Sequence, residues 1–351
     1  MLCFWESDPV IAVKWAFCVT KQPVAGYCLS GSRLPPQPLP HTERIIVQIT
    51  AYICLVIATL CWGGNAVAGK LALGHVSPMM LTLLRWTLAT ALIAAISLPY
   101  LKRDWPLVRR NLPLLCFYGV IGYTTFNAML YSAVQYTTAI NVAIEQAGIP
   151  MLIFLLNFVF FRTSVSVAQF AGFGMTLVGV ALTAAHGDFA TLLQLSLNRG
   201  DALMLIAVVA YSVYTIFLRW KPPVDWRTLM AIPAAAAALT SVPLLIWEGM
   251  NGNVQVPDAN GWVIAFYTAI FASLLAQSLY IKGVETIGAN RAGLFINLVP
   301  VFGTLLSVLL LGEELQVFHM VALALTLGGI AIAEKGRPKD AAPTAPASPV
   351  D

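Results

Sequence analysis

The sequence predicts an all-α integral membrane protein in which ten transmembrane helices form two inverted five-helix repeats. Hydrophobic residues make up 59% of the chain and charged residues only 10%, whereas soluble domains carry about 25% charged residues. Ten apolar runs are each long enough, at about 20 residues, to cross a hydrocarbon core of about 30 Å. Two segments, 139–181 and 289–331, also match each other without gaps at a constant offset of 150 residues.

The apolar runs define the expected transmembrane helices in chain order. They cover 46–69, 78–99, 112–134, 139–161, 166–185, 201–220, 227–247, 261–283, 289–311 and 315–334. The first five form a first repeat, 46–185, and the last five a second repeat, 201–334, joined by a linker, 186–200. Residues 1–45 are expected to be a disordered tail or a start site assigned too early, because prolines and charges interrupt them. The polar, proline-rich residues 335–351 predict a disordered cytoplasmic tail.

The match between the two segments indicates an internal duplication. Two Leu/Ala/Gly-rich helices can match by chance, but prolines and glycines that keep register favour duplication. Each copy holds five helices, an odd number, so the second copy must enter the membrane the opposite way up. Inverted repeats of this kind place a substrate site near the bilayer midplane, where the halves meet. The identical positions include Pro150/Pro300, Thr176/Thr326 and Gly179/Gly329.

The distribution of lysine and arginine predicts that both termini lie in the cytoplasm. Basic residues gather in alternate loops, at 102–110, 162, 219–227 and 282–291, and in the C-terminal tail. The opposite loops carry mainly acidic residues, although Lys70 and Arg199 lie there. Because cytoplasmic loops are enriched in Lys and Arg, we expect a multi-pass protein of the inner or plasma membrane, with the lipid bilayer around it.

Several other classes of function find no support in the sequence. The six cysteines form no CxxC pair and have no histidine at metal-ligand spacing, so neither a metal site nor a cofactor is predicted. The net charge of +4 is spread over loops rather than gathered in one patch, which speaks against nucleic-acid binding. No Walker-type loop, HExxH or GxSxG motif is present, so ATP hydrolysis and an intramembrane enzyme are not expected.

Three groups of residues resemble EamA-type members of the drug/metabolite transporter superfamily. They are Trp62-Gly63-Gly64-Asn65 with Lys70, Pro78 and Arg85 after it, the run from Leu298 to Glu313, and Gly328-Gly329. The likeness covers about residues 46–335. It implies two inverted bundles, a central cavity and transport of small metabolites, often outward. The first repeat departs from the family, because Arg162-Thr163 stands where a Gly-Glu pair is usual.

Glu145 and Arg85 are the charged residues that we expect deepest in the membrane. Glu145 lies about 9 Å and Arg85 about 10 Å into their helices at the usual rise per residue. A lone charge at such depth costs at least about 2.5 kcal/mol, so each needs a partner or a function. Glu145 is expected to face the cavity and bind a cationic group or a proton, and the alternative is a neutral carboxyl group held by a hydrogen bond to a neighbouring helix. Arg85 either pairs with Glu145, snorkels to the surface, or binds an anionic or zwitterionic cargo.

Other polar side chains are candidates for the cavity lining. Asn141 shares a helix face with Glu145, and amides and phenols suit hydrogen bonding to a small solute. The same residues also fit ordinary packing of membrane helices. Pro150 and Pro300 free backbone carbonyls near the middle of their helices and are candidate hinges. The remaining candidates are Trp62, Asn65, Asn127, Tyr131, Gln277, Tyr280, Asn290 and Asn297.

The function that this pattern favours is a secondary active or facilitative carrier that works by alternating access. The expected cargo is a small metabolite such as an amino acid or a related amine, moved outward, with protons as a candidate coupling ion. A nucleotide-sugar or multidrug exporter is the alternative carrier, and a membrane scaffold or receptor the less favoured class. The sequence leaves open the cargo, the direction, the coupling ion, the oligomeric state and the translation of residues 1–43.

Overall fold

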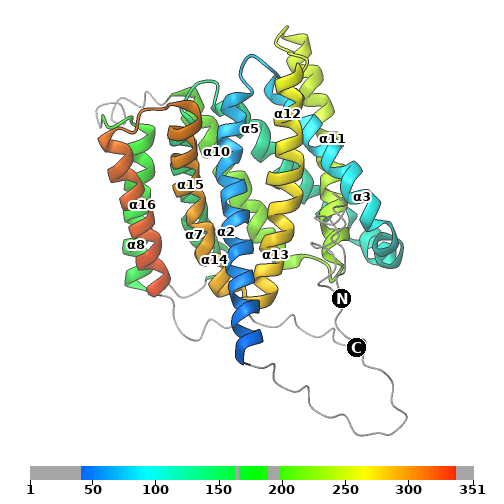
Figure 1. Ribbon diagram of the computed structural model, residues 1–351, viewed down its shortest axis with the longest axis horizontal. Helices are drawn as coiled ribbons and strands as arrows, with labels where there is room; N and C mark the ends of the chain where they lie inside the picture. The colour runs from blue at the N-terminus through cyan, green and yellow to red at the C-terminus, as the bar shows by residue number, and fades with distance from the viewer. Residues whose placement is uncertain (1–40, 163–165, 189–197, 337–351) are drawn as a thin grey trace, which may run out of the picture. The chain divides into compact units, whose positions relative to one another are not determined.

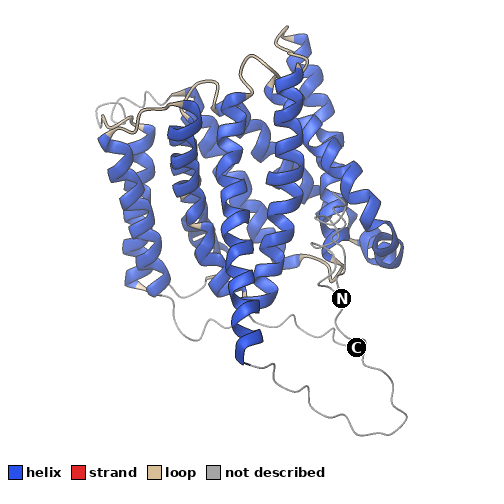
Figure 2. Ribbon diagram, viewed as in Figure 1, coloured by secondary structure: helices blue, strands red, loops and turns tan. Residues whose placement is uncertain are grey.

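The computed structural model describes residues 41–162, 166–188 and 198–336, and the regular structure within these ranges is helical (Figures 1 and 2). The helical bundle belongs to a compact unit that begins at Ile45. The tails expected at 1–40 and 337–351 lie outside the described residues, as do 189–197 of the linker.

The first repeat contains five membrane-crossing elements. Three are single helices: α2 (His41–Leu71), α3 (Pro78–Arg110) and α8 (Val167–Ala184). The third crossing is built from α4 (Leu112–Phe117), the π-helix η2 (Tyr118–Thr125) and α5 (Phe126–Ala133). The fourth consists of α6 (Ala139–Gln146) and α7 (Gly148–Phe161). The helix α3 extends beyond the predicted 78–99, because hydropathy marks only its apolar part. Arg109 and Arg110 lie in its last turn, where positive charges interact favourably with the helix dipole.

The second repeat has the same order of elements. Its single helices are α10 (Arg199–Phe217), which the short 3-10 helix η3 (Leu218–Trp220) follows, α11 (Trp226–Met250) and α16 (Val317–Lys335). The eighth crossing contains α12 (Ala259–Tyr267), the π-helix η4 (Thr268–Leu275) and α13 (Ala276–Ile287). The ninth contains α14 (Ala289–Ile296), α15 (Leu298–Leu306) and the π-helix η5 (Ser307–Leu311).

Ten crossings account for the described helices, as the sequence predicts. Nine of the described helices are long and apolar enough to span a membrane, and the apolar helix Leu298–Leu311 completes the ninth crossing together with α14. Successive crossings alternate in direction, so the second repeat starts at the opposite end of the bundle from the first (Figure 1). We call these ends the His75 end, where α2 ends and α10 begins, and the Glu334 end, where α16 ends.

Irregular backbone falls at equivalent positions in the two repeats. The fourth crossing is interrupted at Ala147 and the ninth at Asn297, each three residues before a proline. Proline removes an N–H and clashes with the preceding turn, which explains both interruptions. The π-helices η2 and η4 are also 150 residues apart at both bounds. The shared irregularities confirm that the two repeats are structural copies, while the hinge function of Pro150 and Pro300 stays a prediction.

The helices α8 and α16, which occupy the same position in the two repeats, lie side by side and pack closely (Figure 1). A Cβ atom added at Gly172 would collide with the backbone of Gly329, and one at Gly329 with that of Gly172. Between them, Thr176 Oγ1 donates to the carbonyl of Thr326, its equivalent at offset 150, at 3.4 Å. Small residues allow this approach, which is the usual source of dispersion energy between membrane helices.

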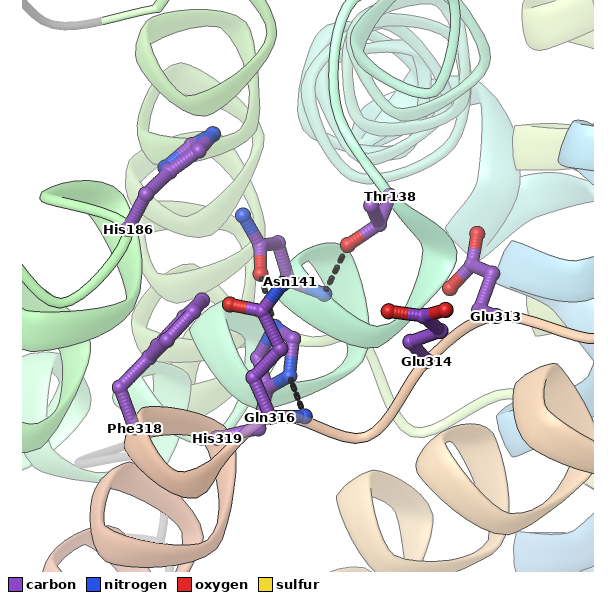
Figure 3. A pocket seen from close by; sticks show the side chains of 8 residues that line it. All are labelled: Thr138, Asn141, His186, Glu313, Glu314, Gln316, Phe318 and His319. Atoms are coloured by element: carbon purple, nitrogen blue, oxygen red, sulfur yellow. Dashed lines mark hydrogen bonds between the residues drawn. The ribbon is translucent and has the colours of Figure 1, made fainter.

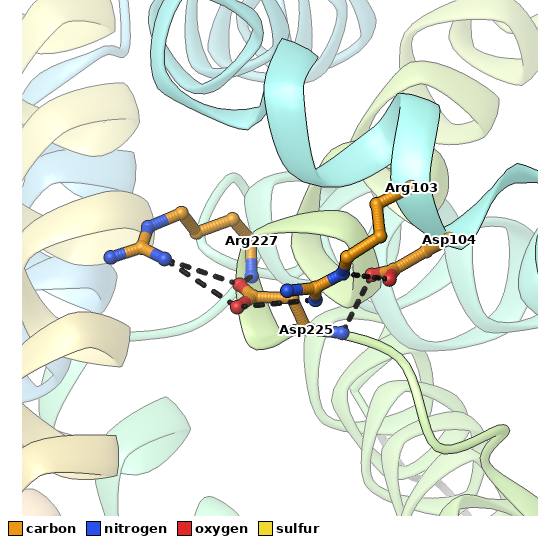
Figure 4. Close-up of polar contacts among 4 residues, drawn as sticks. All are labelled: Arg103, Asp104, Asp225 and Arg227. Atoms are coloured by element: carbon orange, nitrogen blue, oxygen red, sulfur yellow. Dashed lines mark hydrogen bonds and ion pairs between the residues drawn. The ribbon is translucent and has the colours of Figure 1, made fainter. Parts of the chain in front are cut away.

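The helices α3 and α11 form a second close pair, and a carboxylate ties them together at each end. At the His75 end, Glu248 accepts hydrogen bonds from Ser77 Oγ at 2.6 Å and from the Met79 amide at 3.3 Å. At the Glu334 end, Asp104 accepts one from the Asp225 amide at 2.8 Å (Figure 4). Each acid therefore stabilises the N-terminal end of the partner helix, where the helix dipole is positive.

Candidate functional site

A cavity of about 570 Å³, which we call the central cavity, lies between the two repeats. Helices of both repeats line it, and its walls reach Leu218 and Glu334 at the Glu334 end of the bundle. Glycines and prolines interrupt several of the lining helices, which leaves room beside their backbones. Among the residues that the sequence singled out, the lining includes Trp62, Asn65, Arg85, Asn127, Gln277, Tyr280, Asn297, Pro150 and Pro300.

Arg85 is the basic side chain at the centre of this site, and neutral groups hold it in place. Its Nη1 donates to Asn65 Oδ1 and to Tyr131 Oη, both at 2.6 Å. Its Nε donates to Ser273 Oγ at 2.9 Å. Tyr131 in turn donates to Asn65 Oδ1 at 2.9 Å. The helices α2 and α5 and the π-helix η4 thus fix the guanidinium of Arg85, a residue that is 5% exposed.

The charge of Arg85 is not neutralised by a carboxylate. Its three bonded partners are an amide, a phenol and a hydroxyl, and Nη2 has no hydrogen-bond partner among the described residues. The Arg85 guanidinium also lies 5.1 Å from the centre of the Trp86 ring. A cation–π contact contributes about 0.5–2 kcal/mol and leaves the positive charge in place. The central cavity therefore has a positive electrostatic potential at Arg85.

Aromatic rings form much of the remaining wall. Tyr123 stacks on Trp86 with ring centres 4.4 Å apart, and Trp62 contacts Tyr280 at 5.2 Å. Two polar atoms in the wall, Trp86 Nε1 and Asn127 Oδ1, are buried without a hydrogen-bond partner among the described residues. A buried polar atom that lacks a partner costs about 1–3 kcal/mol. The two side chains line the cavity, and each has unused hydrogen-bond capacity in this conformation.

Hydrogen bonds between loops close the bundle at the His75 end. Lys70 Nζ donates to the carbonyls of Val134 and Thr137, both at 2.8 Å. His75 Nδ1 lies 2.7 Å from Asp258 Oδ2. The Gly261 amide, together with His75, lowers the pKa of Asp258 below its usual range, because both stabilise the carboxylate form. These contacts join the end of α2 to the loop after α5, and the loop after α2 to the loop before α12.

A second cavity, of about 410 Å³, lies at the His75 end and is separate in its lining from the central cavity. His319 Nδ1 accepts the Gln316 amide at 3.0 Å, and His319 Nε2 lies 3.0 Å from Asn141 Oδ1 (Figure 3). Since the Gln316 N–H must donate, Nε2 carries the ring proton and donates to Asn141. Asn141 then donates to Thr137 Oγ1 at 3.1 Å.

The comparison with protein families decides the identity of this ten-helix bundle. The sequence model described as "EamA-like transporter family" matches twice, over residues 49–185 and 198–334. The two matches together cover most of the chain. The chain belongs to the EamA-like transporter family. It is a membrane transporter, and each of the two matches spans one five-helix repeat of this EamA-like protein.

Curated relatives of this EamA-like transporter carry transporter names without a stated cargo. The uncharacterized transporter YetK of Bacillus subtilis is 25% identical over 85% of this chain and 91% of its own length. The uncharacterized inner membrane transporter YicL of Salmonella typhimurium is 21% identical over 79% of this chain and 92% of its own. A solved crystal structure with 22% identity has a TM-score of 0.56 over 84% of this chain and 98% of that chain, which shows a shared fold.

The structure corrects the proposed pairing of Arg85 with Glu145. Arg85 contacts Asn65, Tyr131 and Ser273 instead, because it lies between α2, α5 and η4 rather than beside α6. Glu145 is fully buried and, like Asn141, is absent from the lining of the central cavity. Tyr131 reaches the site through Arg85 rather than by lining the cavity. The side chain of Asn290 lies outside the described residues.

Sequence reasoning missed two titratable residues that the EamA-like fold brings toward Glu145. Asp201 is fully buried in the first turn of α10, and His186 Nδ1 lies 3.6 Å from Asp201 Oδ2. Both residues stand at the ends of predicted helices, where charges are usually solvated. One signal was available: Gly200, beside Asp201, allows α10 to approach the backbone of Ala133 and Thr137 closely.

Glu313 lies in the Gly-Glu pair that only the second repeat contains, and the structure shows what its carboxylate binds. Its two carboxylate oxygens accept the amides of Ala139 and Ile140, at 2.8 and 2.9 Å, at the start of α6. Loss of such a cap costs about 0.5–2 kcal/mol. We expect Glu313→Ala to lower the free energy of unfolding by this amount, as measured by reversible unfolding in SDS. The neighbouring exposed Glu314 is the matched control, and an equal loss in Glu314→Ala would contradict the capping function.

Proposed function

We propose that this EamA-like protein is a secondary active or facilitative carrier for a small metabolite that bears an anionic group, such as an amino acid. The observation that supports the proposal is Arg85 in the central cavity, held by neutral partners and without a carboxylate. Guanidinium groups bind carboxylates through paired, charge-assisted hydrogen bonds. The Nη2 group of Arg85 makes no hydrogen bond to the described residues, so it can donate to such a group.

The volume and lining of the central cavity support a small solute. Cavities of about 300–1,000 Å³ are typical of small-molecule sites, and this one has about 570 Å³. The faces of Trp62 and Tyr280 can bind an ammonium group by cation–π attraction. A zwitterionic amino acid would thus place its carboxylate on Arg85 and its ammonium group against aromatic rings. A cargo that carries only positive charge would be repelled by Arg85.

We further propose that the cargo moves outward across the inner or plasma membrane. The Glu334 end carries most of the basic loop residues, which favours a cytoplasmic location for that end and for both termini. The central cavity extends toward this same end, whereas hydrogen-bonded loops close the His75 end. This arrangement suits loading from the cytoplasm, followed by a change to a conformation that is open at the His75 end.

Counterflow in proteoliposomes tests the proposed cargo class. Vesicles are preloaded with a neutral amino acid, and we measure entry of the labelled amino acid in competition with its methyl ester and its decarboxylated amine. We expect the amino acid to exchange and both analogues to compete poorly, because they lack the carboxylate. Preference for the amine would contradict the proposal. Exchange of a nucleotide sugar or a hydrophobic drug would support the alternative carriers, and no exchange of any solute would favour a receptor.

A further inference from the structure

A buried acidic pair lies behind the wall of the central cavity, between α6 and α10. Glu145 and Asp201 are both fully buried, α6 packs against α10, and the charge of Asp201 acts on Glu145 as a like charge. None of their four carboxyl oxygens has a hydrogen bond among the described residues. The Thr137 hydroxyl and the Asn141 amide lie beside Asp201 without reaching hydrogen-bond geometry. The pair therefore has no hydrogen-bond partner among the described residues, and neither acid lines the central cavity.

The charged and titratable groups on the surrounding elements are few. His186, which follows α8, approaches Asp201, while His319 of α16 is held as a neutral donor to Asn141. Lys70 of α2 is bound by two backbone carbonyls, and Glu313 caps the start of α6. Arg199, at the start of α10, is exposed. Asp188 follows His186 by two residues, and among the described residues His186 is the basic group in contact with the pair.

Two carboxyl groups in this setting must hold at least one proton. Burial penalises each charged form, and a second negative charge nearby adds repulsion. The single proton can lie on Glu145 or on Asp201, and the pair can then accept a second proton that arrives through His186. The number of protons on these three groups is therefore variable, whereas a group paired to a fixed lysine or arginine would remain charged.

The second cavity gives the medium a route to this pair. His186 and Asn141 line it, together with Thr138, Glu314 and His319 (Figure 3). A proton taken up by His186 can move from Nδ1 to Asp201 Oδ2, across 3.6 Å, and the proton of Asp201 can pass on to Glu145.

The acidic pair is also mechanically connected to the cargo site. Glu145 precedes the interruption of the fourth crossing at Ala147 by two residues, and Gln146 and Ala147 line the central cavity. We propose that Glu145 and Asp201 form a proton-binding site, distinct from the cargo site and supplied through His186 from the His75 end, which couples transport to protons. This proposal rests on the proposed carrier function, to which it adds the coupling ion.

The test uses reconstituted full-length protein with an imposed pH gradient. A gradient of one unit supports about a tenfold accumulation of cargo for each proton exchanged. We expect wild-type protein to show this accumulation, and we expect Glu145→Gln and Asp201→Asn to lose it while they continue counterflow, which requires no net proton movement. Each amide resembles the neutral acid in size and shape, so it preserves the packing of the protonated form. Glu285→Gln, which changes an exposed carboxylate near the end of α13 and outside the lining of the second cavity, should accumulate cargo like wild type.

Infrared difference spectroscopy of the protein at two pH values gives a second, transport-independent measurement. We expect a carbonyl band of a protonated buried carboxyl group that changes with pH in wild type and is lost in Glu145→Gln. A wild-type spectrum without such a band, or variants that keep proton-driven accumulation, would overturn the proton site. Absence of counterflow in wild type would instead overturn the carrier function, so the two failures are distinguishable.

Discussion

Replacement of Arg85 by glutamine is expected to weaken cargo binding about 10- to 100-fold. A hydrogen bond to a charged group contributes about 1.5–3 kcal/mol, which corresponds to that range of affinity. Glutamine retains a donor but removes the positive charge that the neutral partners of Arg85 leave available. We expect Arg85→Lys to give an intermediate loss, because lysine keeps the charge but loses the planar fork of donors. Counterflow at graded cargo concentrations measures the change as a rise in KM.

Wild type and Arg85→Gln, each measured with the amino acid and with its methyl ester, separate direct cargo contact from a structural effect of Arg85. Arg85 also organises Asn65, Tyr131 and Ser273, so the substitution can disturb the cavity wall without any direct contact. If Arg85 binds the cargo carboxylate, then removal of that carboxylate as the methyl ester should have little further effect in Arg85→Gln. Equal losses for the amino acid and the ester would assign Arg85 a positioning function. Arg110→Gln, at the exposed end of α3, is the matched control.

The fold was predictable from the sequence to the extent that its signals are local. Apolar length determined the ten crossings, and the interruptions at Ala147 and Asn297 follow from Pro150 and Pro300 within the same helices. The π-helices η2 and η4 carry no such signal, because an extra residue in a helical turn is stabilised by packing. In η2, Gly119 packs directly against the backbone of Pro233 in α11, which lies more than a hundred residues away.

The site was predictable as a set of polar residues but not as a set of contacts. Depth along a helix identified Arg85 and Glu145 correctly as buried, yet depth does not determine which helices become neighbours. Arg85 found neutral partners on α2, α5 and η4, and Glu145 found Asp201 on α10. Asp201 and His186 were missed because their burial depends on how the helix ends pack at the His75 end, which a window of hydropathy cannot detect.

The adjacent glycines Gly328 and Gly329 in α16 predict opposite effects of the same substitution. A Cβ atom at Gly329 would come within 2.6 Å of Thr176 Oγ1 and within 2.9 Å of the Thr176 amide nitrogen. Overpacking of this kind costs about 1–3 kcal/mol. At Gly328 the nearest atom would be the flexible end of Met175, at 3.6 Å, so alanine there gains its better helix propensity of up to about 1 kcal/mol.

We therefore expect Gly329→Ala to lower the free energy of unfolding in SDS and Gly328→Ala to raise it slightly. The contrast tests the inverted repeat itself, since Gly329 is the offset-150 equivalent of Gly179, whereas residue 178, the equivalent of Gly328, is valine. Of these two positions, the one that both repeats keep as glycine packs against the backbone of the partner helix, because α8 and α16 meet along equivalent faces. Equal effects at the two positions would mean that α8 and α16 do not pack along these faces in the membrane.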